Sequence, residues 1–292
     1  FITLGNFSAF DGLVIFHPEQ ETSEHPVPYP WTVASAEGGV TNPAIVNVHM
    51  VNPYQAVDFG THAAHRHFIS GLYADILYRG IWIDRCGDCG RIENVHFWPF
   101  WDMDLNKPLR KFTQANAEGM IFGRTDWELV SSCFVLGLKT GYRFTTRERF
   151  ENQTGPEMGG PPGPNVMITG GGADMLTTAV LVETCQPHAG VRFSNCQIFG
   201  DIIVTPSNNG PVTFTGCGFF GTYHGTQGIG QARLEGQGVT SFEHCQFAFY
   251  HNNLKIDHLL NVGSGHLTVA NCTFLPTVAG ALKDPKTSHP IV

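Results

Sequence analysis

Carboxylate side chains concentrate between residues 54 and 104, and they are the groups in this chain best suited to acid–base chemistry. Two carboxylates about 5–9.5 Å apart can cleave a glycosidic bond, one as the acid and the other as the base or nucleophile. We expect Asp84 to form such a pair with Asp102 or with Glu93. The candidate catalytic residues are Asp58, Asp84, Glu93 and Asp102.

Aromatic and cationic side chains lie in the same stretch. Flat indole rings such as those of Trp98 and Trp101 can stack on the apolar faces of sugar rings, while carboxylates bind the hydroxyl groups. The candidate substrate-binding residues are Tyr54, Arg79, Arg85, His96, Trp98 and Trp101. The alternative for the tryptophans is that they pack against a repetitive core or cap it.

Four arginines form a local cationic group on a chain that is acidic overall. They are Arg66, Arg79, Arg85 and Arg91. Arginine binds a carboxylate through two hydrogen bonds, and a lyase acting on a uronic acid polymer must neutralise the substrate carboxylate and supply a base. Surface ion pairs are the alternative role of these arginines, with Asp84, Asp88 and Glu93 as partners.

Histidine and cysteine residues raise the question of a metal site. His62, His65 and His67 lie close together, and Cys86 and Cys89 form a Cys-Gly-Asp-Cys segment. A zinc site built on such a cysteine pair needs a second pair of ligands at a characteristic spacing, and none follows. We therefore expect an exposed polar loop for the histidines, a disulfide or turn packing for the cysteines, and no metal site.

An internal repeat in the last third of the chain indicates the elements that must position these residues. Four segments align on a cysteine: 191–200, 212–221, 239–249 and 267–276. Apolar and polar residues alternate before each cysteine, as in a strand with one buried face. The aligned cysteines are separated by 21, 28 and 27 residues, which matches a coil of a parallel β-helix and falls short of the ~40 residues of a propeller blade.

The repeat extends toward the N-terminus through residues 10–20, 47–53, 71–77, 94–100, 131–137 and 165–172. We predict one all-β domain over residues 1–292, a single-stranded right-handed parallel β-helix with coils of about 20 to 28 residues. A proline-rich excursion near 21–43 and longer loops near 103–125 and 145–165 interrupt it. The rival class, a doubly wound α/β fold, lacks amphipathic helical segments here. Five cysteines should stack in the core as free thiols: Cys133, Cys196, Cys217, Cys245 and Cys272.

Composition limits the partners. The 17 Lys and Arg residues against 25 Asp and Glu residues give a formal charge of −8, which argues against nucleic acid or an anionic membrane as the general partner. No run approaches the ~18 apolar residues of a membrane span. The first residues lack the pattern of a signal peptide and open in a predicted strand, so we expect that an N-terminal portion has been removed.

Four segments resemble the pectate-lyase-like superfamily of right-handed parallel β-helix proteins, which includes pectate-lyase and rhamnogalacturonase-related members. They are FDGLVIFHPEQ, HPVPYPW, NPYQAVDFG and RHFISGLYADILYRGIWIDRCGDCGRIENVHFWPFW, and the resemblance covers most of residues 10–275. It implies the β-helix fold, a secreted or extracellular location and a polysaccharide ligand. The superfamily holds lyases, hydrolases, epimerases and phage tailspikes, so it implies no single reaction.

The chain departs from the catalytic patterns of that superfamily. The polygalacturonase set of Asn-x-Asp, Asp-Asp, Gly-His-Gly and Arg-x-Lys is not present as a set, nor is the Asp-rich calcium motif of typical pectate lyases. Calcium is a candidate cofactor, although the sequence contains no calcium-binding motif. One hypothesis is an extracellular carbohydrate-active protein, a lyase or hydrolase, that cleaves or binds an acidic polysaccharide in a cleft on the side of the β-helix. The other is a structural or adhesive β-helix that forms homo-oligomers or assembles end to end.

Overall fold

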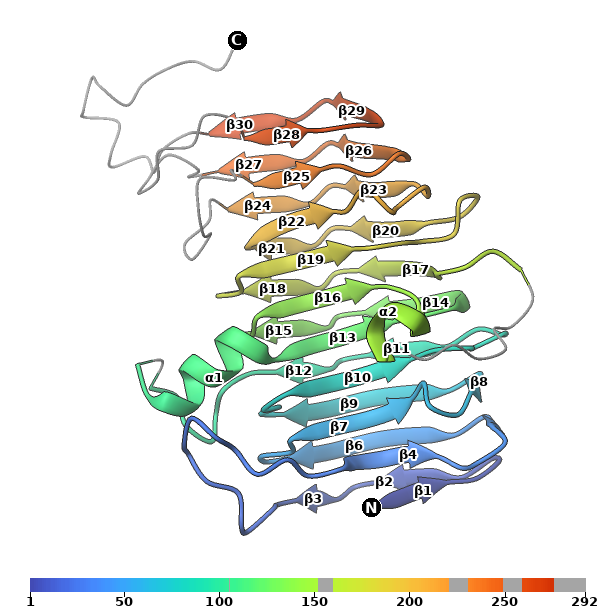
Figure 1. Cartoon of the computed structure of the whole chain (residues 1–292), viewed down its shortest axis with the longest axis vertical. Coiled ribbons are helices and arrows are strands. Elements are labelled where there is room, and N and C mark those ends of the chain that lie inside the picture. Colours follow the sequence, from blue (N-terminus) through green and yellow to red (C-terminus); the bar gives the residue numbers. More distant parts are fainter. Residues whose placement is uncertain (105, 152–159, 221–230, 249–258, 276–292) are drawn as a thin grey trace.

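The chain forms a tall stack of parallel strands in the computed structural model, which describes residues 1–104, 106–151, 160–220, 231–248 and 259–275 (Figure 1). The polypeptide passes from one long sheet to a second one and back, and each pass extends both sheets. Paired strands in both sheets run parallel. The predicted all-β class with parallel strands is confirmed.

Sheet A receives one strand from each pass, so strands adjacent in space are a whole pass apart in sequence. Its strands, in spatial order, are β1 (Ile2–Leu4), β4 (Trp31–Ser35), β7 (Gln55–Phe59), β10 (Arg79–Ile83), β13 (Glu118–Phe122), β16 (Thr140–Phe144), β19 (Thr178–Val182), β22 (Asp201–Val204), β25 (Ala232–Leu234) and β28 (Leu260–Val262). In the register of β7 against β10, Gln55 lies opposite Arg79 and Phe59 opposite Ile83.

Sheet B receives one long strand or two short strands from each pass. Its strands are β2 (Ala9–Asp11), β3 (Val14–Ile15), β6 (Ala44–Met50), β9 (Phe68–Ala74), β11 (Arg91–Glu93), β12 (His96–Phe97), β14 (Thr125–Ser131), β15 (Phe134–Leu136), β17 (Pro164–Thr169), β18 (Gly172–Asp174), β20 (Val191–Ser194), β21 (Gln197–Phe199), β23 (Val212–Thr215), β24 (Gly218–Phe220), β26 (Val239–Glu243), β27 (Gln246–Ala248), β29 (His266–Ala270) and β30 (Thr273–Leu275). A small third sheet pairs β5 (Val40–Thr41) with β8 (Ala64–His65).

A bend between the paired short strands of sheet B explains the repeating cysteine. The residue in the bend has a positive φ, as at Asn195 (54°), Gly216 (63°) and Asn271 (53°), and asparagine and glycine adopt this conformation most easily. The next residue is the repeat cysteine. As predicted, the five repeat cysteines are free thiols, four of them buried and the last half-buried: Cys133, Cys196, Cys217, Cys245 and Cys272.

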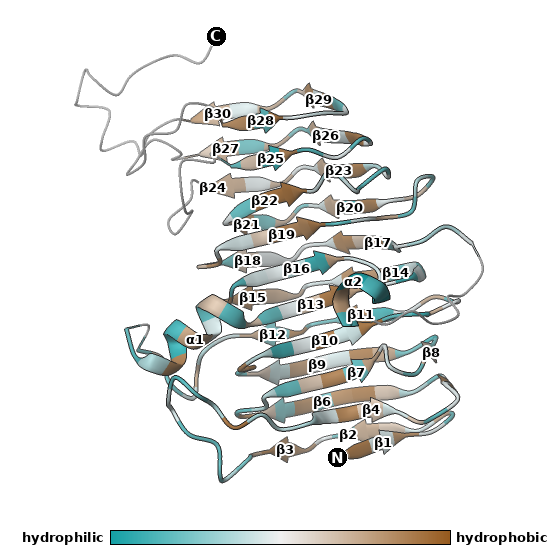
Figure 2. Cartoon of the chain, in the orientation of Figure 1, coloured by the Kyte–Doolittle hydropathy of each residue, from teal (hydrophilic) through white to brown (hydrophobic). Residues whose placement is uncertain are grey.

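The core lies between the sheets and consists of the inward-facing residues of each strand, which alternate with more polar ones (Figure 2). Because neighbouring strands are about 4.8 Å apart, equivalent side chains of successive passes must stack. The rings of Phe193, Phe214 and Phe242 do so, with centroids 5.1 and 5.0 Å apart and nearly parallel planes. These ladders hold one pass against the next.

Three segments predicted as excursions contain regular structure, so those boundaries are partly wrong. Residues 21–30 are irregular, but the remainder of 21–43 includes β4 and β5. The predicted loop 103–125 holds α1 (Pro108–Asn116) and β13, and 145–165 begins with α2 (Arg147–Glu151). Proline in the first turn of α1 starts that helix, because its fixed φ suits the position and its missing N–H costs nothing there.

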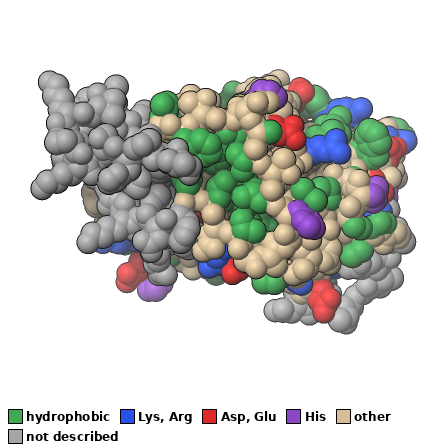
Figure 3. Space-filling view, turned by 90° about the horizontal axis from the view of Figure 1, so that it is seen from above, with side chains coloured by type: hydrophobic (Ala, Val, Ile, Leu, Met, Phe, Trp, Pro, Cys, Tyr) green, Lys and Arg blue, Asp and Glu red, His purple; other side chains and the backbone are tan. Residues whose placement is uncertain are grey.

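Both ends of the described stack expose apolar side chains, because an outermost strand has a neighbour on one side only. Figure 3 looks along the stack from its C-terminal end, where hydrophobic side chains gather near the centre. Val262, Val269 and Leu275 are exposed at this end, and Phe1 and Val14 at the other. Among the described helices, none has the length and apolar character needed to cross a membrane.

A buried carboxylate in β22 makes stability depend on pH. Asp201 is 2% exposed, and its Oδ1 has no hydrogen-bond partner among the described residues. Burial raises the pKa of Asp201 to about 7, although the charge of Arg233 opposes this. The folded protein therefore holds this proton more tightly than the unfolded chain, so stability falls as the pH rises from about 4 to about 7 and stays low above that range.

We expect Asp201→Asn to raise the free energy of unfolding by about 2–4 kcal/mol at pH 8, since each pKa unit is worth ~1.4 kcal/mol. At pH 4 both proteins carry a neutral group at this position, so the gain should nearly vanish. Urea denaturation at the two pH values measures the difference. An equal gain at both values would show that ionisation of Asp201 is not the cause.

Candidate functional site

The ten residues predicted to bind or react lie at three places in the structure. Five are in or beside sheet A: Tyr54, Asp58, Arg79, Asp84 and Arg85. Three are in or beside sheet B: Glu93, His96 and Trp98. Two lie between β12 and α1: Trp101 and Asp102. The expected carboxylate pairs do not form a site, because Asp84 and Asp102 are buried and Glu93 faces solvent from the other sheet.

Asp58 is buried and ends β7 in a tight turn. Its Oδ1 accepts hydrogen bonds from the backbone N–H groups of Gly60 (2.9 Å) and Thr61 (2.7 Å). This is a common structural role of aspartate, in which the side chain bonds to its own backbone a few residues on. The contacts favour a structural role over the predicted catalytic one.

Asp84 is 1% exposed and lies among arginines. Its Oδ1 accepts a hydrogen bond from the backbone N–H of Arg124 at 2.7 Å, and its Oδ2 lies 3.5 Å from Arg147 Nη1 and 3.8 Å from Arg85 Nε. Burial raises the pKa of Asp84, while the Arg124 amide and the two guanidinium groups oppose the rise. Arg85 and Arg147 both donate to the carbonyl of Gly60 as well. The cluster joins the turns of successive passes, so the ion-pair alternative fits Asp84 and Arg85.

The other sheet A candidates pack against aromatic rings. Arg79 Nη1 lies 3.3 Å from Glu151 Oε1, and the guanidinium lies over the Phe150 ring, 4.3 Å from its centroid. Tyr54 stacks on Tyr78 with centroids 5.0 Å apart. The contacts of Arg79 hold α2 against sheet A.

His96 and Trp98 belong to a group of aromatic side chains outside the core. Trp98 stacks on His96 with centroids 5.8 Å apart, and His96 meets the edge of Phe134 at 5.1 Å. Burial lowers the pKa of His96. Trp101 and Asp102 hold the segment before α1 through other contacts. The Trp101 backbone N–H donates to Asp75, which directly follows β9, and Asp102 Oδ1 accepts from Lys107 Nζ at 3.0 Å. The ring contacts of Trp98 therefore fit packing better than an open sugar-binding face.

Glu93 is the predicted residue that lies in a hollow. A groove of about 580 Å³ crosses the outer face of sheet B over β11, β14, β17 and β20. We call it the sheet B groove, and its side chains include Arg91, Glu93, Leu129, Ser131, Met167, Thr169, Arg192 and Ser194. Glu93 Oε1 accepts a hydrogen bond from Ser70 Oγ at 3.0 Å.

Two rows of residues run across the strands of the sheet B groove. One row places Leu129 and Met167 between Arg91 and Arg192. At about 4.8 Å per strand, the two arginines are roughly 14 Å apart along the row. Neither has an ion-pair partner among the described residues. The other row continues from Glu93 through hydroxyl groups, namely Ser131, Thr169 and Ser194.

A smaller hollow of about 170 Å³ shares Met167 and Arg192 with the groove and adds Trp127 and His188. Trp127 is 60% exposed and has a φ of 62°, which is rare for a bulky residue. The register of β14 against β17 shifts between residues 125 and 128. Such irregularities reorient side chains, and this one presents an indole ring beside the groove.

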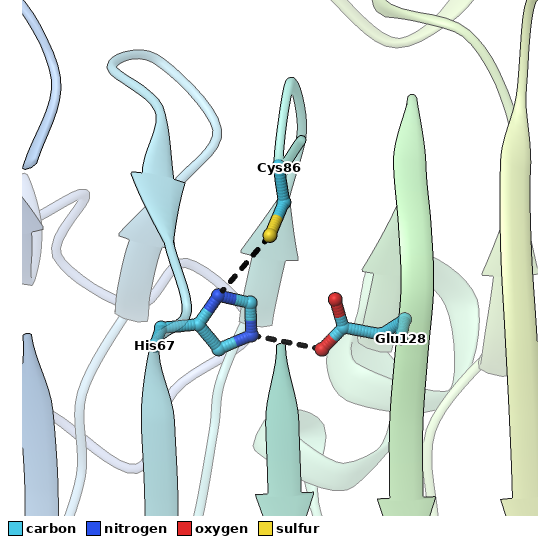
Figure 4. Close-up of side chains that lie close together, drawn as sticks. All are labelled: His67, Cys86 and Glu128. Carbon is cyan, nitrogen blue, oxygen red and sulfur yellow. Dashed lines mark hydrogen bonds and ion pairs between the residues drawn. The ribbon is translucent and has the colours of Figure 1, made fainter. Parts of the chain in front are cut away.

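His67, Cys86 and Glu128 meet inside the stack, where none of the three is exposed to solvent (Figure 4). His67 Nε2 lies 2.8 Å from Glu128 Oε1, and His67 Nδ1 lies 2.8 Å from the Ala64 carbonyl and 3.8 Å from Cys86 Sγ. Burial by itself lowers the pKa of His67, but the charge of Glu128 and the hydrogen bonds of Cys86 and Glu128 hold that pKa well above its usual value.

The pleat of sheet B explains why these residues meet. His67, Gly90 and Glu128 each lie two residues before an inward-facing apolar residue of β9, β11 or β14, so they form one inward row. Gly90 is the middle member, and a Cβ there would lie 2.3 Å from His67 Cε1 and 2.4 Å from Glu128 Oε2. The missing side chain lets His67 and Glu128 touch across the intervening strand.

Sequence reasoning missed this cluster. The prediction of an exposed loop is wrong for His67, and Cys86 and Cys89 are free, so the disulfide alternative is not formed. Glu128 was not considered at all. Glu128 lies two residues before Val130 in the same strand, so both side chains point inward. A charged residue at an inward position needs a buried partner, and this pattern could have identified it.

Comparison of the chain with protein-family models, with curated proteins and with solved structures gives no match.

Proposed function

We propose that this chain is a right-handed parallel β-helix of the pectate-lyase-like kind that binds an acidic polysaccharide outside the cell, in the sheet B groove. The observation that carries the proposal is the row in which Arg91 and Arg192 flank an apolar floor. The alternation of the chain between two long parallel sheets supports the β-helix.

The groove offers a partner for each part of a uronic acid polymer. Arginine binds carboxylates through two charge-assisted hydrogen bonds, so Arg91 and Arg192 suit two carboxylates along one chain. The hydroxyl row that begins beside Glu93 can bind sugar hydroxyl groups, and Met167 and Trp127 provide apolar surface for the ring faces.

Among cleavage reactions, the groove favours β-elimination over hydrolysis. Glycoside hydrolysis commonly needs two carboxylates, and Glu93 is the only carboxylate among the described residues that line the groove. Elimination needs a cation on the substrate carboxylate and one base, which Arg91 or Arg192 and Glu93 can supply. Binding without cleavage corresponds to the adhesive alternative. Elimination forms an unsaturated product that absorbs ultraviolet light, so its appearance distinguishes cleavage from binding alone.

We expect Arg91→Ala and Arg192→Ala each to weaken binding of polygalacturonate about tenfold, because a charge-assisted contact in an open groove is worth ~1.4 kcal/mol. The double variant should bind polygalacturonate about 100-fold more weakly than the wild-type protein. Titration of fluorescently labelled oligogalacturonate at low ionic strength measures the affinities. Binding to the wild-type protein should also weaken as salt is added.

Lys139→Ala is the matched control, since it removes one positive charge from an exposed residue outside the groove. Methyl-esterified polygalacturonate is the matched ligand, because esterification removes the carboxylate charge and keeps the sugar. The proposal is wrong if the esterified polymer binds as tightly as the acid form, or if Lys139→Ala weakens binding as much as Arg192→Ala.

A further inference from the structure

We propose that His67, Cys86 and Glu128 bind one divalent metal ion of the zinc type, which cross-links three successive passes of the stack. This site is separate from the sheet B groove, and it does not depend on the proposed function. The three residues come from different passes: His67 directly precedes β9, Cys86 lies between β10 and β11, and Glu128 is in β14.

The donor atoms match this class of metal. Each residue offers one ligand atom, and these atoms all lie within 4.8 Å of one another. Sulfur, imidazole nitrogen and carboxylate oxygen together are the usual zinc ligands, with bonds of about 2.0–2.3 Å that place the ligands of a tetrahedral site about 3.3–3.8 Å apart. The most widely spaced donor atoms would have to approach one another by about 1 Å to bind a single ion. Cys89, half-buried and three residues after Cys86, or a water molecule can supply the fourth ligand.

An orphaned oxygen atom points to a ligand. Glu128 Oε2 is buried and has no hydrogen-bond partner among the described residues, although Oε1 of the same carboxylate binds His67. A buried carboxylate oxygen without a partner is costly, and an ion is one of the few groups that can satisfy it. Gly90 leaves this oxygen accessible from the His67 side, because any larger residue would fill the space between them.

A simpler account is a buried histidine–glutamate ion pair with a neighbouring thiol, and the two accounts differ in what happens to Cys86. In the ion pair, Cys86 remains a thiol that donates to the Asp88 carbonyl at 2.8 Å. In the metal site, Cys86 loses its proton and binds the ion as a thiolate. A spectroscopic signal of metal–thiolate bonding therefore separates them.

The test uses the full chain after treatment with a chelator, titrated with Co²⁺ and then with Zn²⁺. We expect one equivalent of Co²⁺ to bind and to produce thiolate-to-cobalt charge-transfer absorption in the near ultraviolet, which Zn²⁺ then abolishes by displacement. Cys86→Ser should remove the band and weaken Zn²⁺ binding at least about 100-fold, and Glu128→Gln should weaken it at least about tenfold. Cys133→Ser, which removes another buried thiol, should leave both properties unchanged.

The wild-type spectrum decides the question even where a variant fails to fold. Absence of the charge-transfer band in the wild-type protein overturns the proposal, as does one equivalent of Co²⁺ bound without the band, which would place the ion at the exposed histidines. Persistence of the band in folded Cys86→Ser overturns it as well.

Discussion

Arg110→Leu should lower the free energy of unfolding by about 3–5 kcal/mol at pH 8, because it leaves a buried carboxylate without its partner. Arg110 in α1 donates from Nη1 to Asp75 Oδ1 at 2.9 Å and from Nη2 to Asp75 Oδ2 at 2.8 Å, and both residues are almost completely buried. The pair is a buried polar link between α1 and the stack. Urea denaturation followed by circular dichroism measures the loss.

The pH dependence of this variant has a defined sign. Burial raises the pKa of Asp75 to about 6 even though Arg110 opposes the shift, so the removal of Arg110 must raise that pKa further. At pH 5 the carboxyl of the variant is neutral, and the deficit relative to the wild-type protein should shrink. Lys111→Leu, at the exposed neighbouring position, should cost less than about 0.5 kcal/mol.

The double variant Asp75→Asn with Arg110→Leu completes the comparison. Removal of both charges leaves no buried ion uncompensated, so it should be more stable at pH 8 than Arg110→Leu alone. A double variant as unstable as the sum of the single variants would show that the two side chains do not act as a pair.

Phe214→Ala should lower the free energy of unfolding by about 3–5 kcal/mol, because it opens a cavity among the stacked aromatic rings of the core. Phe214 is fully buried and stacks on Phe193 and Phe242, so the cavity separates three successive passes. Because a stacked repeat depends on contacts between neighbours, we expect the loss of hydrogen-exchange protection to concentrate in β20, β23 and β26.

Thr213→Ala is the control for the core variant, since Thr213 faces outward in the same strand, β23. It should change the melting temperature little. A Phe214→Ala protein with the stability of the control would mean that the ladder contributes no packing energy.

Much of the fold was predictable because its signals are local and repeat. Alternation of apolar and polar residues marked the strands of sheet B, and the repeated cysteines such as Cys196 and Cys217 aligned one strand with the next. The strand β13 was missed because α1 is inserted directly before it, which disturbs the spacing of the repeat. The spacing of the sequence repeat does not reveal an inserted segment that forms its own helix.

The site was less predictable because burial and contact between distant passes decide it. Asp84 has the residue type of a catalytic acid, but the adjacent Arg85 and Arg147 from a later pass enclose it. The sequence does not show that Arg91 and Arg192 lie in one row, because this depends on the register of the intervening strands β14 and β17. Glu93 was expected to pair with Asp84, but Asp84 follows a strand of sheet A and Glu93 lies in sheet B.

Hydroxyl-radical footprinting with and without oligogalacturonate tests most directly whether the sheet B groove binds an acidic polysaccharide. Met167 lies in the groove and Trp127 beside it, whereas Met103 is exposed away from it, before α1. The account predicts that the acidic oligosaccharide slows oxidation of Met167 and Trp127 severalfold, leaves Met103 unchanged, and loses this effect when it is methyl-esterified. Saturating oligogalacturonate that protects none of these residues, or that protects Met103 alone, would contradict it.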